Sequence, residues 1–243
     1  MQVIQHFLKN NLRNFNYIVL SDVNGEAIFF DPSDIEQTLP LCASNGGEPK
    51  YLINTHYHAD HMKDNDKLLE QTQAKEVLLE HEDEFSLSDS EDLKCLFTPG
   101  HVMDHKCYLL REKGEEVGII CGDTIFNAGM GNCKNGGDVE TLYQTFKNII
   151  HPLSDHLKIY PSHDYFLNNL KFAESVEPDN QYIQEYIQKR ESMDCDHEFM
   201  ITTVGEERLY NPFFRAFQKD FQKKMNKNEK ELFIYLRSLR DNW

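Results

Sequence analysis

The segment Thr55 to His61, which reads THYHADH, constrains this chain more than any other feature. It follows the apolar run Tyr51–Ile53, which predicts a buried strand, and it places three imidazoles and one carboxylate within six positions. Imidazole nitrogen and carboxylate oxygen are ligands that suit zinc, iron and manganese. Without a metal ion, several neutral imidazoles packed together leave many ring nitrogens in need of partners. The segment therefore indicates a metal site rather than a polar surface loop.

Three later segments each offer one more ligand of the same chemistry. His101 stands on a Pro-Gly turn, where the backbone can expose a side chain. Asp123 follows the predicted strand 117–121, and His163 follows a short apolar pair. Each signal is weak alone, but their order after THYHADH argues against coincidence.

Together these residues resemble the H-x-H-x-D-H signature and the ligand series of the metallo-β-lactamase superfamily. The resemblance implies an α/β fold, the αββα sandwich, in which two central sheets are flanked by helices. It also implies two divalent metal ions. One ion is expected on His56, His58 and His101. The other is expected on Asp60, His61 and His163. Asp123 would bridge them, because a carboxylate has two oxygens to share. Zinc is the expected metal, with iron or manganese as alternatives, since the same ligands accept all three.

The first half of the chain is typical of short strands interrupted by turns and helices. Asn24-Gly25 separates the apolar runs 17–20 and 27–30 and predicts a hairpin. Segment 68–72 and the acidic stretch 80–92 are expected to be helix or surface loop. Strands that alternate with helices favour an α/β arrangement.

Helical spacing dominates the second half. Apolar residues recur with helical periodicity from Asp138, the expected N-cap, to Ile150. Further helices are expected through residues 183–187 and 232–239.

The second half narrows the resemblance to the glyoxalase II family of thioesterases. Three segments carry it: the LNNLKFAESVEPDN run at 167–180, the YNPF-containing stretch 207–215, and the RSLRDNW ending at 237–243. The resemblance covers essentially the whole chain. It implies a catalytic metallo-β-lactamase domain over residues 1–165 and a helical glutathione-binding domain over residues 166–243.

Four residues are expected to bind substrate. Arg237 and Arg240 are three apart on a predicted helix and share a face, so they can hold the carboxylates of a glutathione tail. Tyr165 matches the tyrosine of the family's H-E-Y segment, which reads H-D-Y here. The family usually has a basic and an aromatic residue after G-D-T-x-F-x-x-G-x-G, where this chain has Asn-Cys-Lys at 132–134. Lys134 is expected to take the place of the family's basic residue.

The resemblance implies hydrolysis of S-(2-hydroxyacyl)glutathione thioesters, the last step of methylglyoxal detoxification. S-D-lactoylglutathione would be cleaved to D-lactate and glutathione. A hydroxide that bridges the two metal ions would attack the thioester carbonyl, with Asp60 and Asp123 as the catalytic carboxylates. The thiolate is a good leaving group and demands no general acid. His105 lies outside the ligand series and is expected to be structural or to support a ligand.

Two alternatives stay open. A glutathione persulfide dioxygenase, a mononuclear iron enzyme of the same superfamily, also uses glutathione, but that family generally lacks the long C-terminal helical region. A degenerate relative that serves only as a binding module would have lost a ligand, and none is lost here.

Composition limits the partners. The chain has 243 residues, and 41 acidic against 25 basic residues give a formal net charge of −16. Such a surface repels nucleic acids and anionic membranes. No run approaches the roughly 18 apolar residues of a membrane span, and no signal peptide is evident. Six scattered cysteines suit free thiols. We therefore expect a cytoplasmic monomer whose partner is a small glutathione thioester.

Overall fold

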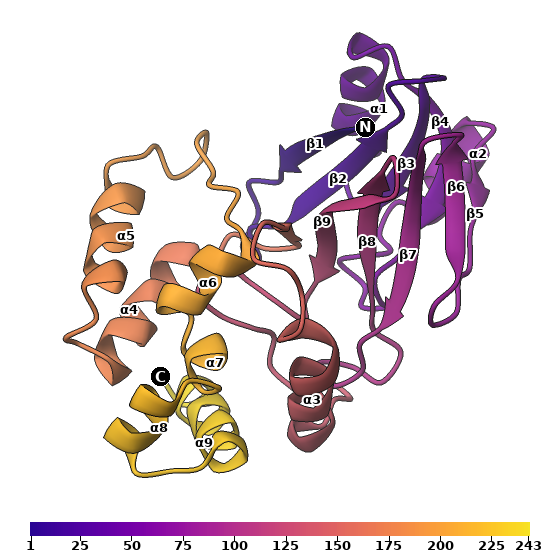
Figure 1. The fold of residues 1–243 in the computed structure, drawn as a ribbon. Coiled ribbons are helices and arrows are strands. Elements are labelled where there is room, and N and C mark those ends of the chain that lie inside the picture. Colours follow the sequence, from indigo (N-terminus) through magenta and orange to yellow (C-terminus); the bar gives the residue numbers. More distant parts are fainter. The chain divides into compact units, whose positions relative to one another are not determined.

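The computed structural model describes all residues, 1–243, and the chain forms two compact units (Figure 1). The first unit comprises Met1–Phe97 and Asp104–Gly122. The second unit comprises Thr98–Met103 and Asp123–Trp243. The predicted domain boundary after residue 165 differs from this division into two units, and it stays a prediction.

A mixed sheet with the strand order β1-β2-β3-β4-β5 begins the first unit. Its strands are β1 (Gln2–Phe7), β2 (Phe15–Leu20), β3 (Glu26–Phe30), β4 (Glu48–Ile53) and β5 (Lys75–Glu76). The first three strands are antiparallel, whereas β3, β4 and β5 are parallel. The predicted hairpin is confirmed, because Val19 pairs with Ile28 across a turn in which Gly25 adopts a φ of 75°.

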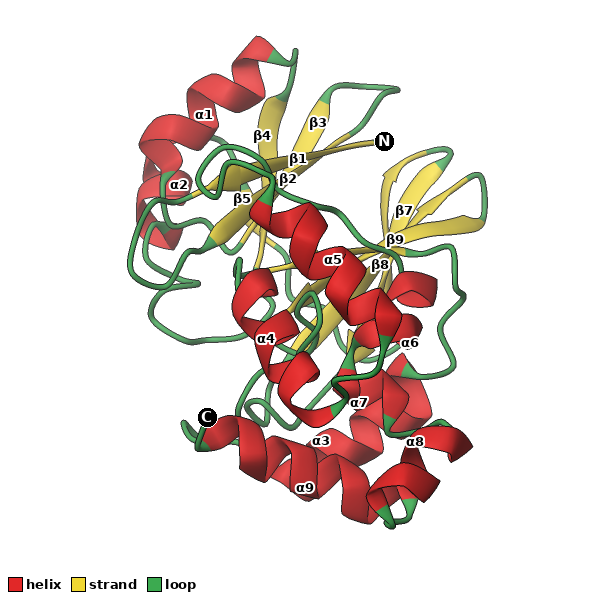
Figure 2. Cartoon of the chain, turned by 90° about the vertical axis from the view of Figure 1, so that its left-hand side faces the viewer, coloured by secondary structure: helices red, strands yellow, loops and turns green.

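Two helices, α1 (Ile35–Ser44) and α2 (Asn65–Gln71), cover one face of this sheet (Figure 2). Ile18, Phe29 and Leu52 from three strands share a buried cluster with Ile35 and Leu68 of the helices. The crossovers through α1 and α2 are what make β3, β4 and β5 parallel, since parallel neighbours need a long connection. Polar loops at the ends of β3 and β4 are thereby brought to the same edge of the sheet.

The second sheet of this unit contains four antiparallel strands in the order β9-β8-β7-β6. They are β6 (Glu84–Ser88), β7 (Glu91–Phe97), β8 (Lys106–Glu112) and β9 (Glu115–Gly122). The two sheets are in contact through aromatic pairs. The rings of Phe30 and Tyr108 lie 5.4 Å apart, and those of Tyr51 and Phe85 lie 4.8 Å apart.

The expectation of helix or surface loop over residues 80–92 is wrong, because this stretch contains β6 and the start of β7. In β6 the apolar residues Phe85 and Leu87 alternate with exposed or half-buried polar ones. Leu87 is buried, and Phe85 packs edge-on against Tyr51. The alternation of period two is typical of a half-buried strand, and the high acidic content obscured it.

The second unit is mainly helical. Its elements are α3 (Val139–Thr145), the π-helical turn η1 (Phe146–Ile150), β10 (Lys158–Pro161), α4 (Phe166–Val176), α5 (Gln181–Glu191), α6 (Val204–Tyr210), α7 (Pro212–Arg215), α8 (Lys219–Met225) and α9 (Glu229–Asp241). The helices predicted after Asp138, through 183–187 and through 232–239 are confirmed. The Asp138 side chain caps α3 by accepting the Thr141 N–H at 2.7 Å. No helix of the chain is both long and apolar enough to cross a membrane.

Aromatic residues hold the second unit together. Tyr143 and Phe146, on the predicted apolar stripe of α3 and η1, pack against Phe233 of α9. A separate cluster joins Phe166 of α4 to Tyr210 of α6. The C-terminal helices therefore form one body with the segment that begins at Asp123.

Candidate active site

The THYHADH loop begins directly after β4 and gathers its imidazoles in the first unit. The Nε2 atom of His56 lies 3.0 Å from Nδ1 of His58, and the rings of His56 and His61 lie 4.0 Å apart. Asn54 closes the loop by donating its side-chain amide to the His61 carbonyl at 2.9 Å. His56 and His61 are buried, whereas His58 and Asp60 are half-buried.

Asp31, at the end of β3, orients His61. Its carboxylate accepts the Thr55 N–H at 2.7 Å and the Thr55 hydroxyl at 2.6 Å, and it lies 3.0 Å from Nδ1 of His61. Burial by itself would raise the pKa of Asp31, but His61, His56 and Thr55 hold that pKa below its ordinary value. An ionised carboxylate only accepts hydrogen bonds, so Nδ1 of His61 carries the proton and Nε2 offers its lone pair.

The lone pair of His61 Nε2 faces a second acceptor. Oδ2 of Asp60 lies 3.3 Å away and also accepts a hydrogen bond from the Asn14 amide at 2.9 Å. Two acceptors this close require a cation between them, either a proton or a metal ion. The sequence interpretation missed both Asp31 and Asn14. The polar Asp-Pro pair that follows the apolar β3 is the signal that points to Asp31.

The second unit holds three further predicted ligands close together, all of them buried. Nδ1 of His101 lies 2.6 Å from the Asn132 carbonyl oxygen, which can only accept, so Nε2 of His101 is unprotonated in the neutral ring. This Nε2 faces Oδ2 of Asp123 at 3.4 Å. Nε2 of His163 lies 3.3 Å from the other carboxylate oxygen, Oδ1. Each oxygen of Asp123 thus faces one imidazole, and the donor set fits divalent cations.

Gly131 makes this arrangement possible. Its N–H donates to the Asp123 carbonyl at 2.9 Å. A Cβ at this position would lie 2.2 Å from the Asp123 carbonyl oxygen and 2.7 Å from Nδ1 of His101. Only glycine permits so close an approach of the backbone to two predicted ligands.

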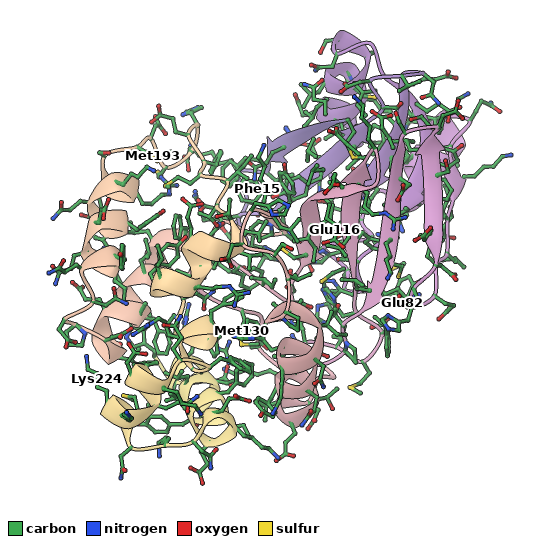
Figure 3. All side chains as sticks on the ribbon, viewed as in Figure 1. Phe15, Glu82, Glu116, Met130, Met193 and Lys224 are labelled. Carbon is green, nitrogen blue, oxygen red and sulfur yellow. The ribbon has the colours of Figure 1, made fainter.

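A pocket of about 260 Å³ in the second unit is lined by all four predicted substrate-binding residues. These are Lys134, Tyr165, Arg237 and Arg240. Its other walls include Phe126, Met130, Asn169 and Trp243. Met130 lies among the side chains of this unit (Figure 3). The Tyr165 ring stacks on His163, with a centroid distance of 5.0 Å, so the pocket begins next to a predicted ligand.

The two arginines of α9 differ in their surroundings. Arg237 is only 4% exposed, and its guanidinium donates to the carbonyls of Met130 and Gly131 at 3.0 and 3.2 Å and pairs with Asp241 at 2.9 Å. Arg240 is half-buried and donates one hydrogen bond, to Asn169 at 3.2 Å. Burial lowers the pKa of both guanidiniums. Arg240 therefore has more donors available for a ligand.

Comparison with known proteins decides the family. Residues 164–243 match the family described as hydroxyacylglutathione hydrolase C-terminus, and residues 33–97 match the metallo-beta-lactamase superfamily. The chain is 35% identical to a hydroxyacylglutathione hydrolase of Nitrosococcus oceani, with both chains covered completely. This chain belongs to the hydroxyacylglutathione hydrolase family.

Other relatives agree with this membership. A hydroxyacylglutathione hydrolase of Polaromonas is 34% identical over 96% of this chain and 97% of its own. The Arabidopsis thaliana protein named hydroxyacylglutathione hydrolase cytoplasmic is 28% identical over 95% of each chain. The crystal structure of ETHE1 from Myxococcus xanthus superimposes with a TM-score of 0.72 over 98% of this chain and 90% of its own, at 22% identity. The expected αββα sandwich with a C-terminal helical domain is confirmed.

Two departures from the usual hydroxyacylglutathione hydrolase pattern have structural partners here. Lys134 donates to the Asp241 carbonyl at 3.0 Å, at the rim of the pocket. Asp164, where the family usually has glutamate, pairs with the buried Arg190 of α5 at 3.1 Å. The shorter carboxylate is thus accommodated by an arginine that reaches it from a neighbouring helix.

His105 is completely buried in the first unit, and its ring stacks on His56 with centroids 5.0 Å apart. Gly122 leaves room for it, because a Cβ there would lie 2.5 Å from Nε2 of His105. His105 therefore contacts a predicted ligand directly, and its role, structural or in support of that ligand, stays a prediction.

Proposed function

We propose that this protein hydrolyses S-(2-hydroxyacyl)glutathione thioesters, with S-D-lactoylglutathione as substrate and D-lactate and glutathione as products. The observation that carries this proposal is the full-length identity of 35% to a relative named hydroxyacylglutathione hydrolase. The match extends through residues 164–243, which supply Tyr165, Arg237 and Arg240 to the pocket. A thioester hydrolase of this kind completes the detoxification of methylglyoxal.

We propose two divalent cations as cofactors, zinc first and iron or manganese as alternatives. The residues that would hold one are His56, His58 and His101. The residues that would hold the other are Asp60, His61 and His163, with Asp123 shared. Two acceptor pairs, His61 with Asp60 and His101 with Asp123, support this assignment because each needs a cation. When bound, the cations supply a water of lowered pKa and polarise the thioester carbonyl.

The chain's own residues prepare the site and hold the substrate. Asp31 and the Asn132 carbonyl keep the protons of His61 and His101 on Nδ1, so that each Nε2 stays available as a ligand. Arg240 and Tyr165 would bind the glutathione tail, and Lys134 would add positive charge. The leaving thiolate needs little protonation, because an ordinary thiol ionises near pH 8.5.

The direct test is hydrolysis of S-D-lactoylglutathione by protein loaded with zinc, followed by the loss of thioester absorbance. We expect rapid turnover that chelation abolishes and zinc restores. Absence of turnover by protein with a full complement of metal would contradict the proposal. Oxygen uptake with glutathione persulfide would then test the dioxygenase alternative, which the match to the hydrolase C-terminal family disfavours.

We also propose that the protein works in the cytoplasm as a monomer, with a small thioester as its partner rather than a nucleic acid or a membrane. The net charge of −16 supports the exclusion of polyanions. The Arabidopsis relative whose name includes the word cytoplasmic supports the compartment. Cell fractionation and light scattering on the purified protein test the compartment and the monomeric state.

A further inference from the structure

Glu207 of α6 is a fully buried carboxylate that has no part in the proposed chemistry. Its Oε2 accepts the Ala128 N–H and the Asn211 side-chain amide, both at 2.8 Å. Its Oε1 accepts the hydroxyls of Thr202 and Tyr210, also at 2.8 Å. Burial raises the pKa of Glu207 to about 7, although these four donors oppose the rise. Such a group is costly to bury, so it needs a structural or functional reason.

The donor Ala128 lies at the centre of a tight turn. The N–H of Phe126 donates to the Gly129 carbonyl, and the N–H of Gly129 donates back to the Phe126 carbonyl. Ala128 adopts a φ of 56°, a left-handed conformation that is unfavourable for a residue with a Cβ. The hydrogen bond from its N–H to Glu207 stabilises this conformation.

Asn211 supports the same turn from the other side. Its amide, which donates to Glu207, also lies 3.1 Å from the Gly129 carbonyl oxygen. Its own Oδ1 accepts the Phe213 N–H and caps α7. Glu207 and Asn211 therefore fix the turn at residues 126–129 against the junction of α6 and α7.

The residues of this turn and those that follow it contact the candidate site within the same unit. Phe126 packs edge-on against both His163 and Tyr165, with centroid distances of 5.7 and 5.3 Å. Phe126 and Met130 line the pocket. Gly131 follows at once and abuts His101 and Asp123. Any shift of the turn displaces pocket walls and ligand neighbours together.

We infer that Glu207 is a positioning residue for both the pocket and the metal ligands of the second unit. It acts by holding the turn at residues 126–129. The expected effects of Glu207 on KM and kcat rest on the proposed thioesterase function. Its consequences for the turn and for metal affinity do not depend on that function.

Three variants separate positioning from a merely structural role. Glu207→Met keeps the length of the side chain and removes both acceptors. Glu207→Gln keeps an acceptor for Ala128, and its amide can donate to the hydroxyl oxygens of Thr202 and Tyr210. Tyr210→Phe is the matched control, because it removes one donor to the same carboxylate without touching the turn.

The readouts are amide hydrogen exchange at residues 126–131, zinc affinity by competition with a chelator, and the separate values of KM and kcat. For Glu207→Met we expect exchange at least about tenfold faster, zinc binding about tenfold weaker and KM about tenfold higher. For Glu207→Gln we expect all three readouts to lie closer to the wild-type values than those of Glu207→Met. Tyr210→Phe should lower the unfolding temperature without moving them.

The inference fails if Glu207→Met leaves exchange and zinc affinity as in wild type, or if Tyr210→Phe changes them equally. If Glu207→Met does not fold, Asn211→Ser replaces it, because serine can still cap α7 but is too short to reach Gly129. The same faster exchange and weaker zinc binding are then expected. A wild-type protein without thioesterase activity would overturn the proposed function, while exchange and zinc affinity would still decide the role of Glu207.

Discussion

The Nδ1 atom of His101 lies 2.6 Å from the carbonyl oxygen of Asn132, the first residue of the segment where this chain departs from its family. Because this contact is made by the backbone of Asn132, the unusual side chain at position 132 does not change the orientation of His101. In the same way Asp31 orients His61. In each unit an acceptor on Nδ1 keeps the imidazole proton on that atom, so that the lone pair of Nε2 can bind a cation.

Asp31→Asn should weaken zinc binding about 10- to 100-fold. The amide nitrogen can face Nδ1 of His61 and force it to accept, which moves the ring proton to Nε2 and blocks the ligand lone pair. Competition with a chromophoric chelator measures the change. Asp34→Asn is the matched control, since Asp34 pairs with the half-buried His6 at 3.2 Å and should leave zinc affinity unaltered. Equal affinities for the Asp31 variant and wild type would refute this role.

Gly131→Ala should reduce bound zinc and kcat while the protein stays folded. The added Cβ would meet the Asp123 carbonyl oxygen at 2.2 Å and Nδ1 of His101 at 2.7 Å, so the backbone beside these two predicted ligands must move. Elemental analysis and circular dichroism report the two effects separately. Gly205→Ala serves as the control, because its Cβ meets Asp155 at 3.0 Å on the surface. A wild-type zinc content in Gly131→Ala would contradict this prediction, because it would show that the backbone moves without disturbing the two residues.

The single variants Arg237→Ala and Arg240→Ala should have different effects. Arg240 has donors to spare, so its loss should raise KM about tenfold or more with little change in stability, as expected for one charge-assisted hydrogen bond. Arg237 holds the carbonyls of Met130 and Gly131, so its loss should cost about 2 kcal/mol of unfolding free energy. Steady-state kinetics and denaturant titration distinguish the two outcomes. A larger KM effect for Arg237 with unchanged stability would reverse the assignment.

The stability of the protein should gain a pH dependence from Glu207. Its pKa is raised from 4.5 to about 7 in the folded chain, so its contribution is fully present below about pH 4.5 and is lost as the pH rises through 7. One pKa unit corresponds to about 1.36 kcal/mol. Between pH 4 and pH 8 the free energy of unfolding of Glu207→Gln should therefore rise by about 3 kcal/mol relative to that of the wild type. The phenol of Tyr210, which donates to Glu207, and that of Tyr186, which donates to the neighbouring Glu206, stay neutral in this range because their pKa values are raised.

Unfolding free energies of the Glu207→Gln and wild-type proteins at several pH values, measured in the same buffers, check this prediction. Taking the difference between the two proteins cancels the other titrating groups. A difference that does not grow with pH would mean that Glu207 ionises at its ordinary pKa in the folded protein.

Much of the fold and site follows from local patterns in the chain. Short apolar runs predicted β4 and β9, helical periodicity predicted α3, α5 and α9, and Asn24-Gly25 predicted the first hairpin. These features depend on residues that are close together in the sequence, so local sequence patterns are enough to predict them. The sequence patterns do not reveal the strand at Glu84–Ser88, because the acidic residues around it are typical of a surface loop, although its own apolar residues alternate.

The sequence by itself determined the family, and it predicted the types and the order of the metal ligands. A cluster of histidines and aspartates with fixed spacing has few other physical explanations. Only the tertiary structure decided which residues orient those ligands and which of the two arginines is free to bind. Asp31 and His61 are 30 positions apart, Arg237 and Met130 are 107 apart, and Glu207 and Ala128 are 79 apart. Hydrogen bonds over such separations depend on how whole elements pack, and no local pattern of residues encodes that packing.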